Sequence, residues 1–267
     1  MEWNVVKNYP AYLCTIKKEN ERTEFALKQL DKVGITDITI VYGIDARTSS
    51  GEAKVIKKCK KYNIPIQRFT KYGEAALFCA FYEALTHFLT TDHTHMLWFE
   101  DDIILHYDID FTVFEKSRYK HFNLTYLGGG FADKELYKPQ YVKNNKYWLD
   151  CKNARIYGTH ALLLDKKAVK VLLNSKNTAV AIDTYINNTY LSYKNFKRGC
   201  VIYPIFKNWE DVYNESDSAI RLKKILSNKE YRKITKPYRL SFNGNIWWGI
   251  FFQRNISTVL QIQRRFK

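Results

Sequence analysis

The sequence predicts an α/β fold with a mostly parallel central sheet flanked by helices. Strand-like apolar runs alternate with helix-like amphipathic stretches from residue 11 to residue 173. The 267 residues are 46% hydrophobic and 26% charged, which is typical of a folded globular protein rather than a disordered chain. One apolar run is followed directly by acidic residues, and in open sheets ligands bind at the carboxyl ends of strands.

The first elements predict a β-α-β unit. Residues 11–16 and 38–42 are predicted strands, and residues 21–33 between them have apolar side chains at helical spacing. A longer helix is predicted over residues 73–89, because apolar side chains there form one stripe. Such a stripe is more typical of a core than of a binding site. Its members are Leu77, Phe81, Ala84, Leu85 and Phe88.

Further strands and one helix continue this alternation. Apolar runs predict buried strands at 96–99, 125–127 and 161–164, and the last leads into a helix over 166–173. The chain has no internal repeat and no linker rich in proline, glycine or serine. We therefore expect one main domain over residues 1–220, followed by a basic, aromatic C-terminal helical segment over residues 221–267.

Charge and cysteine content limit the class of protein. The 43 lysines and arginines exceed the 27 acids, giving a formal charge of +16 that attracts nucleic acid, acidic lipid or phosphorylated small molecules. Five cysteines without a Cys-x-x-Cys pair exclude zinc-ribbon and thioredoxin-like sites and fit a reducing compartment. The N-terminus lacks a signal-like pattern, and no apolar run reaches about 18 residues. We expect a cytoplasmic protein.

The acidic trio Glu100, Asp101 and Asp102 directly follows the apolar run 96–99. Adjacent carboxylates repel one another, and a divalent cation such as Mn²⁺ or Mg²⁺ holds oxygen ligands together. In an extended chain Glu100 and Asp102 project to one side and Asp101 to the other, so one face can hold a metal and the other a sugar hydroxyl. A solvated acidic turn is the alternative. The basic charge favours a metal shared with an anion such as a diphosphate.

The glycine pattern excludes two nucleotide-binding motifs. There is no Gly-x-x-x-x-Gly-Lys-Ser/Thr segment, and Gly128-Gly129-Gly130 lacks the Gly-x-Gly-x-x-Gly spacing. The triple glycine either lets the backbone approach a ligand or turns the chain, and both interpretations stay open.

Six short segments between residues 12 and 217 follow one another in a recognisable order and spacing. They are Cys14 to Arg22, Gly43 to Ala46, Gly73-Glu74, Leu97 to Asp102, Tyr157 to Leu164, and Ala181-Ile182-Asp183 with Ser216-Asp217 after it. In this order they resemble glycosyltransferase family 25, the lipooligosaccharide-type and collagen-type galactosyltransferase relatives. The chain departs from the family pattern at Thr15, where the family has Asn, at Ala46 for Gly, and at Ala80-Phe81 for a Ser-His pair.

The resemblance implies a Rossmann-like GT-A fold and a metal-dependent transferase. The enzyme would move a sugar, expected from a UDP-hexose, to a hydroxyl of a glycan, glycolipid or glycoprotein, with inversion at the sugar carbon. Mn²⁺ or Mg²⁺ would lie on Asp102 and Glu100. The residues expected to contact the nucleotide sugar are Arg22, Asp45, Glu100, Asp101, Gly158 and Thr159. For Arg22, a place in a helix's first turn is the alternative.

Two residues are candidates for catalysis. Asp183 follows an apolar run and is the candidate base that accepts the proton of the acceptor hydroxyl. The alternative is that Asp183 caps a helix, a role for which aspartate is a favourable residue. His160 precedes a predicted strand and would contact donor phosphate, acceptor or metal; a buried, hydrogen-bonded histidine is its alternative. The other five histidines have no metal-ligand spacing and are expected in surface or packing positions.

The C-terminal segment has an interfacial pattern. Aromatic and aliphatic residues between Trp248 and Phe266 would line one side of a helix, with Arg254 and Arg265 on another, which suits an anionic membrane surface. Packing on the main domain is the alternative. The main rival function is a basic nucleic-acid-binding protein without catalytic activity, although no zinc finger, RNP-type motif or helix-turn-helix supports specific nucleic-acid recognition. A metal-dependent nuclease or phosphohydrolase is a second rival, but no set of separated ligands with histidines supports it.

Overall fold

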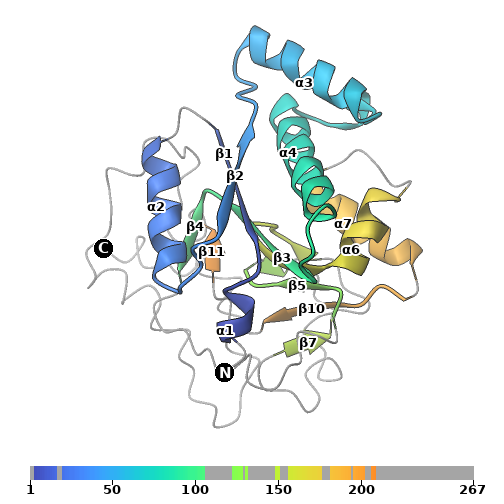
Figure 1. The fold of residues 1–267 in the computed structure, drawn as a ribbon. Helices are drawn as coiled ribbons and strands as arrows, with labels where there is room; N and C mark the ends of the chain where they lie inside the picture. The colour runs from blue at the N-terminus through green and yellow to red at the C-terminus, as the bar shows by residue number, and fades with distance from the viewer. Residues whose placement is uncertain are drawn as a thin grey trace, which may run out of the picture.

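The computed structural model describes residues 3–16, 20–105, 122–128, 130–131, 148–150, 156–175, 181–193, 195–201 and 206–208. Within them, a seven-stranded sheet has helices on both faces (Figure 1). The predicted α/β class is therefore confirmed. The predicted C-terminal segment, residues 221–267, lies outside the described residues, and so does Ser216-Asp217.

The strands of the sheet lie in the order β2-β1-β3-β9-β5-β10-β7. Their bounds are β1 Ala11–Ile16, β2 Ile38–Gly43, β3 His95–Glu100, β5 Leu124–Tyr126, β7 Trp148–Asp150, β9 Ala161–Asp165 and β10 Arg198–Val201. Strands β2, β1, β3, β5 and β10 point one way, whereas β9 and β7 are antiparallel to their neighbours. Five of the seven strands point one way, so the sheet is mostly parallel, as predicted. Strand β9, in the middle of the strand order, is antiparallel to both of its neighbours.

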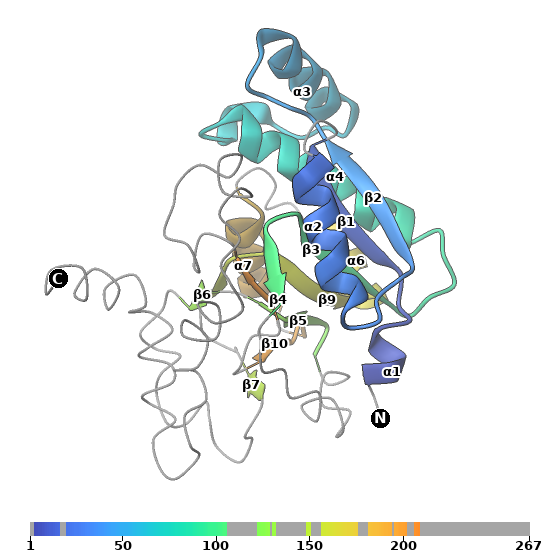
Figure 2. The ribbon, with the colours of Figure 1, turned by 90° about the vertical axis from the view of Figure 1, so that its left-hand side faces the viewer.

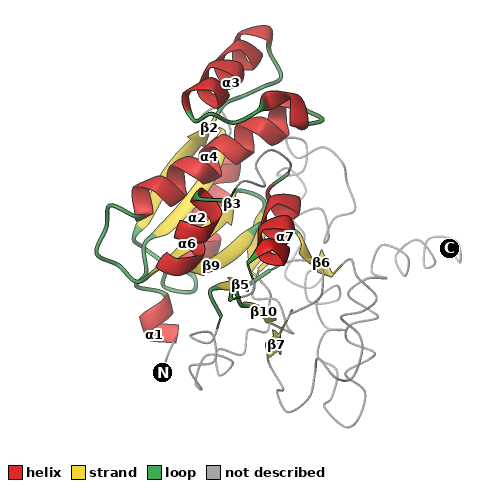
Figure 3. Cartoon of the chain, turned by 90° about the vertical axis from the view of Figure 1, so that its right-hand side faces the viewer, coloured by secondary structure: helices red, strands yellow, loops and turns green. Residues whose placement is uncertain are grey.

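Two hydrophobic cores form because side chains alternate along each strand. On β1, Tyr12 and Cys14 belong to one core and Ala11 and Leu13 to the other. The first core lies under α4 (Tyr72–Phe88), α6 (Lys166–Leu173) and α7 (Ile182–Ser192), and α3 (Ser49–Lys61) packs against α4 (Figure 3). The second core lies under α1 (Trp3–Val6) and α2 (Asn20–Asp31) (Figure 2).

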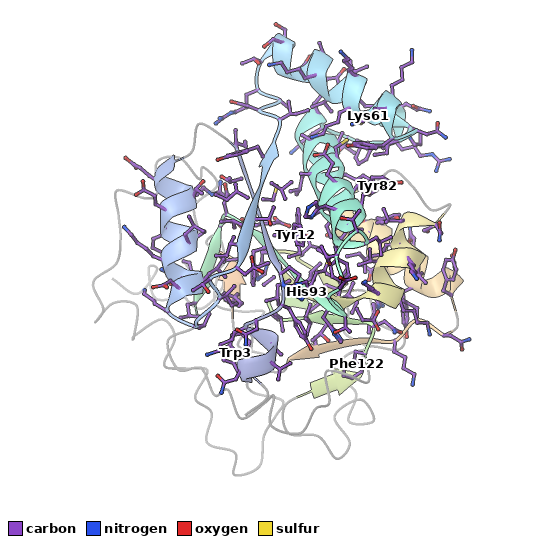
Figure 4. The ribbon with its side chains drawn as sticks, in the orientation of Figure 1. Trp3, Tyr12, Lys61, Tyr82, His93 and Phe122 are labelled. Carbon is purple, nitrogen blue, oxygen red and sulfur yellow. The ribbon has the colours of Figure 1, made fainter. Side chains whose placement is uncertain are left out.

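Helix α1 is fastened by the side chain of Trp3, whose Nε1 donates to the carbonyl of Val33 at 2.8 Å (Figure 4). The helix predicted over 21–33 is observed as α2 and ends at Asp31. Gly34 follows with a left-handed φ of 76°, a conformation that glycine adopts at little cost. Val33 lies in the turn between the end of α2 and Gly34 and remains buried.

The remaining elements are short. Strand β4 (Ile103–Leu105) pairs with β11 (Phe206–Asn208), β6 (Gly130–Phe131) pairs with β8 (Ile156–Tyr157), and η1 (Ile66–Arg68) is a 3₁₀ helix. The sequence did not predict these elements or helix α3. No helix among the described residues combines the length and the apolar character that crossing a bilayer requires.

One edge of the sheet collects the segments with candidate site residues. The register pairs Ile16 with Gly43 and Cys14 with Glu100, so β1, β2 and β3 end at this edge. Because β9 is antiparallel to β3, with Phe99 opposite Ala161, β9 begins where β3 ends.

Candidate functional site

A pocket of about 190 Å³ lies where β3 ends, β9 begins, and helices α4 and α7 start. Five residues predicted for the site line it: Glu100, Gly158, Thr159, His160 and Asp183. The other lining residues are Glu74, Leu77, Ala181 and Ile182. Residues that lie 83 positions apart in the sequence, from 100 to 183, thus meet around one cavity.

Strand pairing forms the floor of this pocket. The backbone N–H of Glu100 donates to the carbonyl of His160 at 3.0 Å, and the Thr159 hydroxyl donates to Glu100 Oε1 at 2.7 Å. Burial raises the pKa of the Glu100 carboxyl to about 8, and the Asp102 carboxylate nearby adds to the rise, while the bond from Thr159 opposes it. A cation beside Glu100 would therefore favour its ionised form.

The other two acids of the trio bind the protein's own arginine. Arg22, in the first turn of α2, approaches Asp101 Oδ1 at 2.9 Å and Asp102 Oδ2 at 3.5 Å. The hydroxyl of Thr15 donates to Asp101 Oδ2 at 2.8 Å and lies 2.7 Å from the Thr23 hydroxyl. Thr15, which the sequence marked only as a departure from the family pattern, is thus a structural partner of the trio.

The expected alternation of the three acids is wrong. It assumed that the extended chain continues through Asp102, but β3 ends at Glu100 and residues 101 and 102 form a turn. The turn brings Asp101 and Asp102 to one guanidinium, that of Arg22, while Glu100 lies in the pocket. Asp101 and Asp102 therefore lie together and Glu100 lies apart from them, whereas the prediction grouped Glu100 with Asp102.

The chemistry of these carboxylates fits a divalent cation with shared ligands. The described residues contain no group of three or more His, Cys, Asp or Glu side chains placed to hold a metal ion by themselves. Mg²⁺ in nucleotide sites is commonly held by one or two carboxylates together with substrate phosphates. Glu100 and Asp102 supply two carboxylates of this kind, and the metal that they would hold stays a prediction.

Two helix starts form the wall of the pocket. On α4, the Glu74 carboxylate accepts from the backbone N–H of Thr70 at 3.1 Å and from its hydroxyl at 2.7 Å. On α7, Asp183 Oδ1 accepts from the backbone N–H of Thr184 at 2.5 Å. The N-cap position of α7 is Ala181, which makes no side-chain cap bond. Asp183 is therefore not the N-cap residue, although its carboxylate satisfies one donor of the helix's first turn.

His160 is 2% exposed and packs against the backbone of Gly128. A Cβ atom at Gly128 would lie 2.4 Å from His160 Nε2 and 2.3 Å from the carbonyl oxygen of Phe206. The first glycine of the triple run is thus needed for a close approach to protein atoms rather than to a ligand. Gly129 lies outside the described residues, and Gly130 begins β6.

Asp45, Arg22, Asp101 and Asp102 do not line the pocket. Arg22, Asp101 and Asp102 are linked to the pocket through their charges, which act on the Glu100 carboxyl. Glu100 adjoins Asp101 in the chain. Asp45 follows β2, and its carboxylate binds the guanidinium of Arg47 with contacts of 2.8 and 2.9 Å. The nucleotide-binding roles of Arg22 and Asp45 stay predictions.

Other histidines occupy packing or surface positions. His87 Nδ1 lies 2.8 Å from the Tyr12 hydroxyl, His95 stacks on Tyr9, and His93 is exposed. His106 and His121 lie outside the described residues. The residues that sequence reasoning missed in the pocket are Leu77, Ala181 and Ile182, which were assigned to apolar runs, and Glu74, which was noted only as beginning a helix. Only three-dimensional packing separates a pocket-lining apolar residue from a core residue.

No protein family model and no curated protein matches the chain. Among solved structures, it is similar to the inositol-1-phosphate CTP transferase from T. maritima, with 10% identity, 86% of this chain and 96% of that chain covered, and a TM-score of 0.43. It is also similar to a putative glucose-1-phosphate thymidylyltransferase from Bacillus anthracis, in complex with a sucrose, with 12% identity, 84% and 99% covered, and a TM-score of 0.41. A third structure is the galactosyltransferase LgtC with donor and acceptor sugar analogs, with 11% identity, 84% and 99% covered, and a TM-score of 0.38. Likeness at this level assigns no activity.

Proposed function

We propose that the protein is a glycosyltransferase, similar to family 25, that moves a hexose from a nucleotide-diphosphate donor, expected to be a UDP-sugar, to a hydroxyl of a glycan, glycolipid or glycoprotein. One observation carries the proposal. Five residues predicted from the sequence as site residues, spread from position 100 to position 183, line a single pocket at a sheet edge where ligands of α/β proteins commonly bind.

The donor would lie across the end of β3. Its sugar would occupy the pocket, with Gly158 and Thr159 on the floor, and its diphosphate would lie towards Glu100 and Asp102. These two carboxylates would hold Mn²⁺ or Mg²⁺, which supplies charge neutralisation for the departing diphosphate. Asp101 and Arg22 would keep the turn after Glu100 in place, because their ion pair is 2.9 Å long and largely buried.

Asp183 would act as the base. It lines the pocket from the first turn of α7. In the proposed step the acceptor hydroxyl gives its proton to Asp183 while its oxygen forms a bond to the anomeric carbon. The bond from that carbon to the diphosphate breaks on the opposite side, and the sugar configuration inverts. His160 would support the acceptor or phosphate by hydrogen bonding.

Nucleotide recognition and acceptor recruitment belong to the same proposal. Arg22 and Asp45 would contact the ribose and base, for which their present partners, Asp101 and Arg47, would have to share them. The C-terminal segment, outside the described residues, would anchor the protein at an anionic membrane surface that carries a lipid-linked acceptor.

The first experiment measures melting temperature in the presence of nucleoside diphosphates and their sugars, with and without MnCl₂. A ligand that binds the folded state raises the melting temperature in a concentration-dependent way. We expect one nucleotide series to do so, and to do so more strongly with manganese. No shift in any series, together with tight RNA binding that weakens steeply with salt, would instead favour the nucleic-acid-binding alternative.

The second experiment separates base from cap. In Asp183→Asn, the amide oxygen can still accept from Thr184, so we expect an unchanged melting temperature and donor affinity. Release of nucleoside diphosphate from the bound donor should fall by about 10²–10⁴-fold, the usual contribution of a positioned base. Asp31→Asn, at the exposed end of α2, is the matched control. A lowered melting temperature with normal turnover would assign Asp183 to the helix alone.

A further inference from the structure

The pocket is acidic although the chain is basic. Among the described residues that line it, Glu74 and Asp183 contribute carboxylates, and neither lysine nor arginine is present. Glu100 adds a third acidic side chain, whose carboxyl has a pKa raised by burial to about 8 and is therefore mostly protonated at neutral pH when no cation is bound. The whole chain has a formal charge of +16. The excess of acid is thus local, and it limits which part of a ligand can enter the pocket.

The two helices that begin at the pocket would by themselves attract an anion, in contrast to the acidic side chains. A helix N-terminus has unsatisfied N–H groups and a partial positive charge, so it ordinarily favours an anion. Here each helix start already has a carboxylate of the protein. Glu74 accepts from Thr70 beside the start of α4, and Asp183 accepts from Thr184 within α7. Each helix start therefore has a carboxylate near its positive end, which makes the approach of a second anion less favourable. Neither N-cap residue, Lys71 of α4 or Ala181 of α7, makes a side-chain bond to the N–H groups of the first turn.

We propose that the pocket selects a donor sugar without an acidic group, either a neutral hexose or an amino sugar, and that Glu74 is a residue that imposes this selection. The inference rests on the proposed function. Carboxylates accept hydrogen bonds from sugar hydroxyl or ammonium groups, whereas the carboxylate of a uronic acid would face like charge in a confined space. Leu77, Ala181 and Ile182 offer apolar surface to the C–H face of the ring.

The size of the pocket suits one ring. Its volume is about 190 Å³. A monosaccharide fills such a space, whereas a disaccharide or a nucleoside with its phosphates extends beyond it. The diphosphate, which needs cations, would remain outside the acidic wall.

Substitution of Glu74 tests the selection of the sugar without changing the residues that carry out the proposed reaction. It has no part in the proposed proton transfer, which uses Asp183, or in the proposed metal site, which uses Glu100 and Asp102. Its two oxygens lie 2.8 and 2.7 Å from Thr70 Oγ1 and share the one proton of that hydroxyl, so the carboxylate is held at the pocket. Glu74→Gln keeps the length and one acceptor oxygen but removes the charge, and it leaves the start of α4 without its compensating anion.

The test uses the full chain and isothermal titration calorimetry with MnCl₂. The nucleotide is first chosen as the tightest binder among UDP, GDP, CDP and dTDP. The neutral sugar of that nucleotide that binds best is then compared with the uronate of the same ring configuration, for example UDP-glucose with UDP-glucuronate. We expect the neutral sugar to bind about tenfold tighter or more, because like charges brought together away from water are strongly disfavoured.

In Glu74→Gln, we expect this ratio to fall towards one through tighter binding of the uronate, with affinity for the nucleoside diphosphate unchanged. Glu21→Gln, an exposed acid on α2, is the matched control and should keep the wild-type ratio. Equal affinity of the wild type for both sugars would overturn the selection while leaving the transferase proposal in place. A ratio that persists in Glu74→Gln would overturn the role of Glu74. No binding of any nucleoside diphosphate would refute the proposed function, and this inference with it.

Discussion

Thr15→Val tests whether the acidic turn depends on the hydrogen bond from β1. Thr15 is 2% exposed and its hydroxyl donates to Asp101 Oδ2 at 2.8 Å. A hydrogen bond to a charged group contributes about 1.5–3 kcal/mol. Because Asp101 keeps its ion pair with Arg22, we expect the lower part of this range, about 2 kcal/mol, as the loss in the free energy of unfolding. The shape of the side chain is retained, so no cavity adds to this value.

Urea unfolding followed by circular dichroism measures this loss, with the slope of the transition expected to stay constant. Thr39→Val is the matched control, because Thr39 is an exposed threonine on β2, where the same substitution should change stability by less than about 0.5 kcal/mol. If Thr15→Val and Thr39→Val unfold at the same urea concentration, the bond to Asp101 contributes nothing. The claim that β1 supports the acidic turn would then be wrong.

Two further predictions concern the floor of the pocket. Gly128→Ala would place a Cβ atom 2.3 Å from the Phe206 carbonyl oxygen and 2.4 Å from His160 Nε2, so we expect a loss of about 1–3 kcal/mol in urea unfolding. Gly73→Ala has open space around its Cβ and should be neutral or slightly stabilising; equal effects would contradict the packing argument. Burial raises the pKa of folded Glu100 to about 8 from about 4.3 in the unfolded chain, so the folded state binds more protons between these values. Stability should therefore fall as pH rises from about 5 to 8 in chelator-treated buffer, and Glu100→Gln should remove that part of the slope; an unchanged slope would refute it.

The sequence predicted five of the seven strands of the sheet and missed β7 and β10. Four of the five, β1, β3, β5 and β9, are apolar runs whose residues are mostly buried on both faces. The run around Trp98 is apolar without interruption and was found as β3, and the strand predicted over residues 11–16 has the bounds of β1. Amphipathic spacing also located α4 to within one residue at each end. Uninterrupted apolar runs and helical spacing are visible in short stretches of the sequence, so local patterns suffice to predict these elements.

Helix α3 shows where local pattern fails. Its buried residues are Gly51, Val55 and Cys59, a narrow stripe among lysines, so charge concealed the helical period. Gly51, in the first turn of α3, packs against the carbonyl of Asp45, which a Cβ atom would approach to 1.8 Å. That requirement comes from packing between the start of the helix and the preceding loop, and sequence spacing alone does not encode it.

Strand direction is the second property that local pattern does not contain. An apolar run reads the same whether the strand is parallel or antiparallel, so residues 161–164 gave no sign that β9 runs against β3. In an all-parallel sheet Thr159 and His160, which precede the strand, would lie at the edge opposite Glu100. The reversal of β9 brings them to Glu100 instead, so the site depends on topology that the prediction of separate elements lacks.

The charge of the chain and the charge of the pocket act over different distances. At physiological ionic strength the Debye length is about 8 Å, so exposed lysines farther from the pocket contribute little to the potential inside it. Within the pocket, the carboxylates of Glu74 and Asp183 act at short range, where the effective dielectric constant is lower and each pair interacts more strongly. Under the proposed function, the basic charge of the chain would favour the encounter with a phosphorylated donor, whereas the acidic side chains of the pocket would select the sugar of that donor. The prediction of an anionic partner from composition and the proposal of a sugar without an acidic group would then describe two ends of the same ligand.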